Sequence, residues 1–275
     1  MIQSISAEAY HADPAPQPSL SSSVAQILLT QSPRHAWLAH PKLNPNYVAE
    51  EDSRFDLGSA AHAMLLEGDD SGIVWVDADD WRTKAAKEHR DAARAAGVLP
   101  LLIKYQPILQ AMVAEAQTYV ASSELGDILS TGAAEQTLMW EENGTHCRAR
   151  LDLLSADRRV ILDYKSTENA APDAFIRQIG RMQYDVQAEF YCRGVRSEGG
   201  DPTFVFLAQE ITPPFACSLV GLSNAYREIG QSKCERAIRL WAHCLATNEW
   251  PGYSNRVAYA EPPAYMLNEL APKED

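Results

Sequence analysis

Polar and apolar residues alternate along residues 148–153, near the middle of the chain, where Arg148, Arg150 and Asp152 occupy every second position. Because successive side chains of a strand point to opposite faces, this alternation predicts a strand with one charged face. A second predicted strand, residues 160–165, is mostly aliphatic until its last three residues. The polar residues between the two segments predict a hairpin.

The second strand ends in Asp-Tyr-Lys, so Asp163 and Lys165 share a face. With a two-residue turn at positions 156–157, Asp163 becomes the diagonal neighbour of Asp152, with Cα atoms roughly 7–8 Å apart. Two carboxylates at this separation repel one another unless a proton or a cation lies between them. Without a nearby thiolate or histidine cluster, they favour an oxygen-ligated cation such as Mg²⁺ or Mn²⁺. An ordinary amphipathic hairpin with a solvated charged face fits the same spacing.

Helical and strand patterns surround this hairpin and predict an α/β protein. The predicted helices span residues 24–30, 34–40, 56–67, 79–96, 103–122, 174–196 and 224–246. The remaining predicted strands span residues 73–76, 134–140, 203–209 and 215–222. Asn143-Gly144 is a strong local hairpin signal and predicts that the strand before it pairs with the one after it.

The helix predicted at residues 174–196 carries an apolar stripe with a spacing of three or four residues. The stripe consists of Phe175, Ile179, Met182, Val186 and Phe190. Beside it, Gln187 and Tyr191 are four residues apart and project together. They are either surface polar groups or part of a site beside the Asp-Tyr-Lys strand.

A candidate site residue, His62, lies in the helix predicted at residues 56–67. Gly58 and His62 are four residues apart and share a helix face, and the glycine permits a close backbone approach beside the imidazole. Taken alone, this pattern favours a histidine at a packing interface or in the core over a functional one.

Composition limits the class of protein. The 275 residues are 46% hydrophobic and 22% charged, which suits one large or two small globular domains. No apolar run approaches the roughly 20 residues of a membrane span, and residues 1–8 lack the features of a secretory signal. The five cysteines are scattered, with no Cys-x-x-Cys, so we expect no disulfide framework, zinc knuckle or iron–sulfur cluster, and a cytoplasmic location.

The net charge of −13 disfavours a nonspecific basic nucleic-acid binder. Residues 146–196, however, contain nine basic and seven acidic residues and are locally basic. An acidic protein with such a segment can still hold a phosphodiester once cations neutralise its carboxylates.

Taken in order, these pieces resemble the core of the PD-(D/E)xK nuclease superfamily. More closely, they resemble the nuclease domain of exonuclease VIII (RecE) and its phage relatives. The matching pieces are Ser32-Pro33, Leu57-Gly58-Ser-Ala-Ala-His62, Glu135-Gln-Thr-Leu, Arg150-Leu-Asp152, Asp163-Tyr-Lys165, Gln187-Ala-Glu-Phe-Tyr191 and Trp250-Pro-Gly-Tyr253. The resemblance implies a restriction-endonuclease-like core, a central mixed β-sheet flanked by helices. It also implies one exonuclease domain at residues 21–265, between a flexible lead-in (1–20) and a C-terminal tail (266–275).

The resemblance also assigns roles to residues. His62, Asp152, Asp163 and the backbone carbonyl of Tyr164 would bind Mg²⁺, with Mn²⁺ as an alternative. The catalytic set would add four more residues: Lys165 to position or deprotonate the attacking water, Gln187 and Tyr191 to brace the site or contact DNA, and Glu135 as an accessory carboxylate. The chain departs from the family pattern at Leu151, where a proline often precedes the first aspartate.

The family implies a 5′→3′ exonuclease acting on double-stranded DNA ends, in phage-type recombination. It further implies a ring-shaped homo-oligomer and a single-strand annealing protein as partner, with no membrane association. The arginines at 148, 150, 177 and 181 are candidates for contacts to the DNA backbone. Three alternatives stay open: a structure-specific endonuclease, a catalytically silent DNA-end-binding scaffold, and a metal-binding protein acting on small phosphoesters.

Overall fold

The computed structural model describes residues 2–48, 57–68, 70, 72–263 and 266. The strands are β1 (Ile2–Gln3), β2 (Leu20–Ser21), β3 (Ile73–Val76), β4 (Leu99–Leu102), β5 (Ala133–Glu142), β6 (Thr145–Leu154), β7 (Val160–Thr167), β8 (Thr203–Glu210) and β9 (Cys217–Gly221). The helices are α1 (Ala7–His11), α2 (Ser22–Thr30), α3 (Pro33–Leu38), α4 (Leu57–Leu66), α5 (Lys84–Ala95), α6 (Gln106–Ala121), α7 (Ile128–Thr131), α8 (Pro172–Met182), α9 (Tyr184–Ser197) and α10 (Asn224–Thr247).

A seven-stranded mixed sheet forms the centre of the molecule. Its strand order is β1-β5-β6-β7-β8-β9, and β2 pairs with β6 beside this path. The β7–β8 and β2–β6 pairs are parallel and the other neighbours antiparallel. Helices α8 and α9 supply the crossover that the parallel β7–β8 pair requires. This mixed sheet flanked by helices confirms the predicted fold class.

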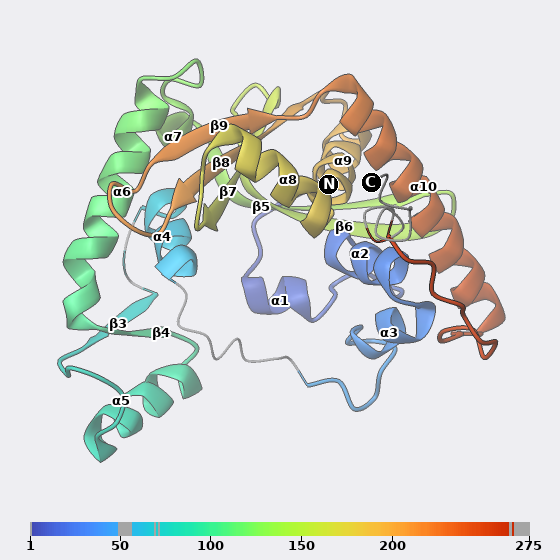
Figure 1. Cartoon of the computed structure of the whole chain (residues 1–275), viewed down its shortest axis with the longest axis horizontal. Helices are drawn as coiled ribbons and strands as arrows, with labels where there is room; N and C mark the ends of the chain where they lie inside the picture. The colour runs from blue at the N-terminus through green and yellow to red at the C-terminus, as the bar shows by residue number, and fades with distance from the viewer. Residues whose placement is uncertain (1, 49–56, 69, 71, 264–265, 267–275) are drawn as a thin grey trace, which may run out of the picture.

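Helices pack on both faces of the sheet, so the molecule has two hydrophobic cores (Figure 1). Helices α2, α8, α9 and α10 contribute to the first core, where Phe190 and Trp241 are fully buried. Helices α4 and α6 contribute to the second, where Leu109 and Met112 are fully buried. The strands between these layers bury both faces.

A small outlying unit lies at one end of the molecule (Figure 1). There β3 and β4 form a separate parallel pair, with α5 as their connection. Thr83 caps α5, because its side chain accepts a hydrogen bond from Ala86 N. The helix therefore begins at Lys84, later than the sequence pattern predicts.

The N-terminal segment differs from the flexible lead-in that the sequence predicts. Within residues 2–20, β1 pairs with β5, and Asp13 is buried. Asp13 accepts hydrogen bonds from Ser19 and lies 3.3 Å from the guanidinium of Arg148. A buried ion pair to a central strand ties this segment to the sheet, and local sequence could not reveal a partner 135 positions away.

The single helix predicted at residues 174–196 is in fact two helices. Gln183 adopts a left-handed backbone conformation (φ 56°), which ends α8 and redirects the chain into α9. The Gln183 carbonyl accepts a hydrogen bond from Gln26 of α2, a contact that stabilises the turn. Met182 is consequently 46% exposed, whereas the other members of the predicted apolar stripe are buried.

The β6–β7 hairpin has a longer loop than the predicted two-residue turn. Leu153 pairs with Leu162 and Leu154 with Ile161, and Ser155 N donates to Val160 O. This register differs by two positions from the predicted one. The faces are unchanged, because a strand repeats every two residues.

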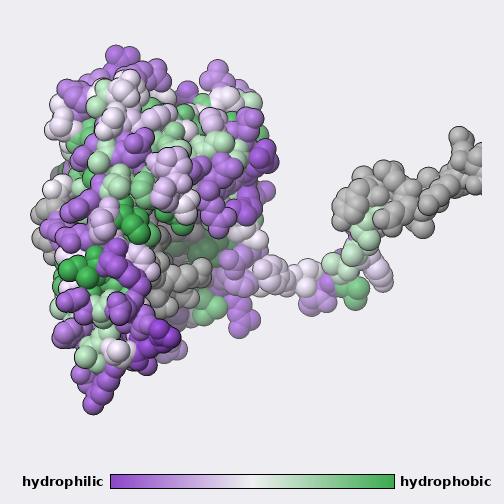
Figure 2. All heavy atoms as spheres, turned by 60° about the vertical axis from the view of Figure 1, so that its left-hand side comes forward, coloured by the Kyte–Doolittle hydropathy of each residue, from purple (hydrophilic) through white to green (hydrophobic). Residues whose placement is uncertain are grey.

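The last part of the chain leaves the body of the molecule. Trp250 packs against Trp241, and Arg34 N donates to Pro251 O. Residues 251–263 are exposed throughout and run away from the body in Figure 2. The predicted tail, residues 266–275, lies outside the described residues except for Met266. Within the described chain, no helix has the length and apolar character needed to cross a membrane.

Candidate active site

The candidate site forms where the strand pairing becomes irregular. The β5–β6 pairing is recorded on both sides of Glu135 and Asp152 but not between them, and Glu135 has a positive φ of 55°. Leu151 then packs in one core and Leu153 in the other, although strict alternation would place them together. A local break of this kind re-aims side chains and is common beside active sites.

Three side chains meet at this break. His62 Nε2 of α4 lies 3.1 Å from Asp152 Oδ2 and 3.6 Å from Glu135 Oε1. Arg150 contacts the other oxygen of Glu135 and also donates to Ile5 O at 2.7 Å. The histidine, 26% exposed, therefore lies against two carboxylates that are each 16% exposed.

Asp163 lies on the neighbouring strand with different partners. Its carboxylate is fully buried, forms an ion pair with Lys165, and accepts a hydrogen bond from Gln187 Nε2 of α9 at 2.6 Å. The ammonium group of Lys165 also lies 5.3 Å from the ring centroid of Tyr184. Asp163 and Lys165 thus share a face, as the alternation predicts.

Tyr164 lies between Asp163 and Lys165 in β7 and contacts the His62–Asp152 pair. Its amide donates to Asp152 Oδ2 at 2.9 Å, and its ring centroid lies 6.2 Å from that of His62. Its hydroxyl donates to Gln209 Oε1 at 2.8 Å, on the opposite face from Lys165. Tyr164 therefore contacts Asp152 and His62, which the resemblance assigns to the metal together with the Tyr164 backbone carbonyl.

Tyr191 lies deeper than the other predicted site residues. It is buried, forms a hydrogen bond with Gln187, and packs 6.0 Å from the ring of Phe204. Burial raises its pKa well above the usual value. The arrangement suits bracing of Gln187 by a neutral phenol, and a direct DNA contact does not suit a buried hydroxyl.

An open cavity of about 400 Å³ is lined by His62 and Lys165, the two residues that contact Asp152 and Asp163. Its lining residues are Gly58, Ser59, His62, Tyr164, Lys165, Ser166 and Tyr184. The sequence placed Gly58 beside His62 and Tyr184 beside the apolar stripe with Gln187 and Tyr191, but it assigned no site role to Ser59, Ser166 or Tyr184. Tyr184 reaches the cavity because the turn at Gln183 starts α9 there, and no local sequence signal marks that turn.

Two carboxyl groups of the site, those of Asp163 and Glu135, have raised pKa values. Burial raises the pKa of Asp163 to about 7, and the negative charge of Asp152 adds to the rise despite the opposing effect of Lys165. Burial also raises the pKa of Glu135. Burial is thus the main cause of both shifts, and the charge of Asp152 adds to each of them.

The remaining partners favour their charged forms. Burial alone would raise the pKa of Asp152, but the hydrogen bond from His62 and the charges of Lys165 and His62 hold it below its usual value. Burial would lower the pKa values of His62 and Lys165, but the neighbouring carboxylates raise both. The site therefore attracts cations.

The donor set fits a divalent cation. Carboxylate and carbonyl oxygens with one imidazole suit Mg²⁺ or Mn²⁺, and a cation would stabilise the buried Asp163 carboxylate and relieve its repulsion by Asp152, the two causes of its raised pKa. Among the described residues, no group of three or more His, Cys, Asp or Glu side chains is already arranged as a ligand set. Asp163 instead faces Lys165 and Gln187, while His62 and Glu135 face Asp152.

Two of the four arginines predicted to contact DNA have internal roles instead. Arg148 is 3% exposed and binds Ser19 and Asp13, while Arg150 binds Glu135 and Ile5. Arg177 and Arg181 are exposed on α8, which leads directly to Tyr184 at the cavity. The alternation that put charged residues on one face of β6 could not distinguish an outward face from one covered by residues 2–20.

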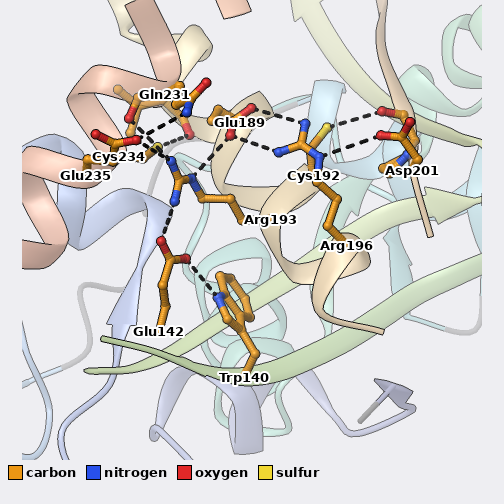
Figure 3. A network of polar contacts seen from close by, with 12 residues as sticks. Trp140, Glu142, Glu189, Cys192, Arg193, Arg196, Asp201, Gln231, Cys234 and Glu235 are labelled. Carbon is orange, nitrogen blue, oxygen red and sulfur yellow. Dashed lines mark hydrogen bonds and ion pairs between the residues drawn. The ribbon is translucent and has the colours of Figure 1, made fainter. Parts of the chain in front are cut away.

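A second charged network lies at the other end of α9 (Figure 3). Arg193 contacts Glu142 of β5, lies 3.2 Å from Glu189 and 3.5 Å from Glu235 of α10, and Arg196 contacts the same Glu189. These ion pairs join the β5–β6 hairpin to α9 and α10. The network opens on a cavity of about 640 Å³ that Trp140 and Arg227 also line.

Comparisons with known proteins agree with this fold. The model of a PDDEXK-like domain of unknown function (DUF3799) matches residues 22–263. No curated protein matches the sequence. Among solved structures, the chain is similar to one described as a "Putative exonuclease" from Eubacterium rectale, with a TM-score of 0.60 and 15% identity over 98% of this chain and 100% of the other. The chain therefore belongs to the PDDEXK-like family of nuclease-fold domains.

Proposed function

We propose that this protein is a divalent-metal-dependent deoxyribonuclease that hydrolyses phosphodiester bonds at double-stranded DNA ends. One observation supports this most strongly: Asp152 and Asp163 lie on adjacent strands, with His62 against the first and Lys165 against the second. PDDEXK nucleases in general use divalent metals, and the family match covers the whole site.

His62, Asp152, Asp163 and the carbonyl of Tyr164 would hold Mg²⁺, or Mn²⁺ in its place. A bound divalent cation lowers the pKa of a coordinated water and polarises a phosphoryl oxygen. Lys165 lines the cavity, where its ammonium group can orient the attacking water and stabilise negative charge on the phosphate. Its contact with Asp163 and the Tyr184 ring holds it there.

Glu135 and Gln187 complete the site from opposite sides. Gln187 donates to Asp163 and fixes the orientation of that carboxylate, with Tyr191 behind it. Glu135 contributes a further carboxylate beside His62, held in place by Arg150. Burial raises the pKa of Glu135, and shifted carboxyl groups of this kind are common in active sites.

Helix α8 offers a surface for the DNA backbone. Arg177 and Arg181 are exposed there, next to the turn that brings Tyr184 into the cavity. Contacts from arginine to phosphate fix position without reading sequence, which suits an enzyme acting on any DNA end. The excess of acidic residues elsewhere would limit binding to this side of the molecule.

The exonuclease VIII resemblance adds finer proposals about the reaction and its partners. These are 5′→3′ polarity, a role in phage-type recombination, a ring-shaped homo-oligomer and a single-strand annealing protein as partner. A structure-specific endonuclease would use the same site on DNA without ends, and a silent scaffold would bind ends without cutting them.

The test uses linear duplex DNA labelled at the 5′ end or the 3′ end, together with a covalently closed circle. With Mg²⁺, the wild-type protein should release the 5′ label first and spare the circle. Lys165→Ala should retain the fold by circular dichroism but lose at least about 100-fold in rate, a typical loss when one group that stabilises the transition state is removed. Cleavage of the circle would support the endonuclease instead, and undiminished digestion by Lys165→Ala would overturn the assignment.

A further inference from the structure

We infer that Gln209 is a positioning residue for the metal ligands and acts on them through Tyr164. The inference rests on the proposed function, because it concerns the same site. Gln209 lies in β8 and is fully buried, in a strand that is otherwise almost entirely apolar. It lies outside the cavity and touches none of the three ligand side chains, so its effect must pass through a neighbour.

The Gln209 amide has a partner for each of its groups. Its oxygen accepts the hydrogen bond of the Tyr164 hydroxyl at 2.8 Å. Its nitrogen donates to Met112 O of α6 at 2.8 Å and to Phe215 O, before β9, at 3.3 Å. Gln209 therefore fastens the Tyr164 side chain to two elements on the far side of the sheet from Lys165.

Tyr164 transmits this restraint to the site in three ways. Its amide donates to Asp152 Oδ2, its ring lies against that of His62, and its carbonyl is the proposed backbone ligand. A tyrosine fixed at both its backbone and its hydroxyl can tilt little, so these three groups keep a constant relation. Groups that orient metal ligands in this way are known to control metal affinity.

The chemistry explains why this position holds glutamine. The buried position needs an acceptor for a phenol and two donors for two carbonyls. A primary amide supplies all three, whereas a carboxylate lacks the donors and an aliphatic side chain lacks everything. A glutamine kept only for packing would not need a hydroxyl partner on the strand that carries Asp163 and Lys165.

The experiment measures Mn²⁺ binding by calorimetry without DNA, beside the melting temperature in a chelator. Tyr164→Phe removes only the hydroxyl, and we expect it to weaken Mn²⁺ binding about 10-fold or more, as loss of a ligand-orienting group does. Gln209→Leu should weaken Mn²⁺ binding to a similar extent. The double variant should bind Mn²⁺ as tightly as whichever single variant has the lower affinity, because both substitutions break the same contact. Ser218→Ala is the matched control, because Ser218 is also buried and donates to a backbone carbonyl, Ala170 O, but does not contact Tyr164.

The outcomes separate a positioning role from a purely structural one. If Tyr164→Phe and Gln209→Leu lower only the melting temperature, or if Ser218→Ala weakens Mn²⁺ binding equally, the inference is wrong. A wild-type protein that binds no Mn²⁺ also overturns it. A wild-type protein that binds Mn²⁺ but leaves DNA intact would overturn the nuclease proposal. The Mn²⁺ affinities of the variants would still test the role of Gln209.

Discussion

Two clusters of charged side chains lie at opposite ends of α9, and they differ in how their charges are matched. Around Arg193, each acidic group faces a guanidinium, and the contacts link three elements of the fold (Figure 3). Around Asp163, three carboxylates share an imidazole, the ammonium group of Lys165 and the guanidinium of Arg150, and burial raises the pKa of Asp163 to about 7. The first cluster links elements of the fold through arginine–glutamate pairs, whereas in the second burial makes the ionised form of Asp163 costly.

This difference separates a structural network from a functional one by physical criteria alone. Matched ion pairs stabilise a fold only if both partners are present, so their removal should show in stability. Crowded carboxylates cost stability and are retained where a cation or a substrate uses them. Substitutions at the two clusters should therefore change different quantities, metal affinity at one and the free energy of unfolding at the other.

The largest effect is expected for Asp163→Asn. The variant should lose more than about 100-fold in Mn²⁺ affinity, since even loss of an outer group costs about 10–100-fold. It should also melt at a higher temperature than wild type in a chelator at pH 8, because it removes a buried charge that Asp152 repels. Calorimetry and thermal melting measure both quantities, and a melting temperature below that of wild type at pH 8 would contradict the raised pKa of Asp163.

The opposite result is expected for Arg193→Ala. Glu189 is 7% exposed and would lose one of its two guanidinium partners, so the free energy of unfolding should fall by about 3 kcal/mol. Mn²⁺ affinity should stay within twofold of wild type. Urea unfolding provides the measurement, and a variant as stable as wild type would show that this network is not structural.

The pH dependence of stability and metal binding follows from Asp163. Because its folded pKa lies above the unfolded value, the protonated form favours folding, and this contribution is lost as pH rises through about 7. Metal binding needs the carboxylate, so Mn²⁺ affinity should fall by about tenfold per pH unit below 7, with one proton released on binding. Calorimetry in buffers of different ionisation enthalpy counts that proton; binding without proton release at pH 6 would contradict the raised pKa of Asp163.

The smallest effect is expected for Arg181→Ala on α8. This arginine is exposed and is proposed to contact a phosphate, so its loss should raise the KM for DNA and leave kcat unchanged. The slope of log affinity against log salt should decrease by about 1, as expected for one lost phosphate contact. Arg239→Ala, on the exposed face of α10, is the matched control and should change neither quantity. Equal effects of the two variants would remove α8 from the DNA surface.

Local pattern predicted the central strands and the shared face of Asp163 and Lys165, because a strand has a strict two-residue period. It predicted Gln187 beside the site, because four residues span one helical turn. It failed at Gln183, whose left-handed backbone conformation is stabilised by Gln26 of a distant helix.

Long-range contacts also decide the roles of Arg148 and Arg150. Both looked like DNA contacts, since their strand has a charged face, but residues 2–20 cover that face. Gln209 likewise looked like the end of an apolar strand until the structure placed it against the Tyr164 hydroxyl. Such roles depend on elements more than 40 residues apart, which periodicity cannot relate.

The most direct test is a crystal structure determined from crystals grown with Mn²⁺, in which anomalous scattering locates the bound ions. Our account predicts one strong peak bounded by His62 Nε2, the carboxylates of Asp152 and Asp163 and the carbonyl of Tyr164, with the Arg193 cluster free of metal. A peak at the Arg193 cluster, or none beside Asp163 at saturating Mn²⁺, would contradict the claim that these carboxylates and the imidazole form a metal site.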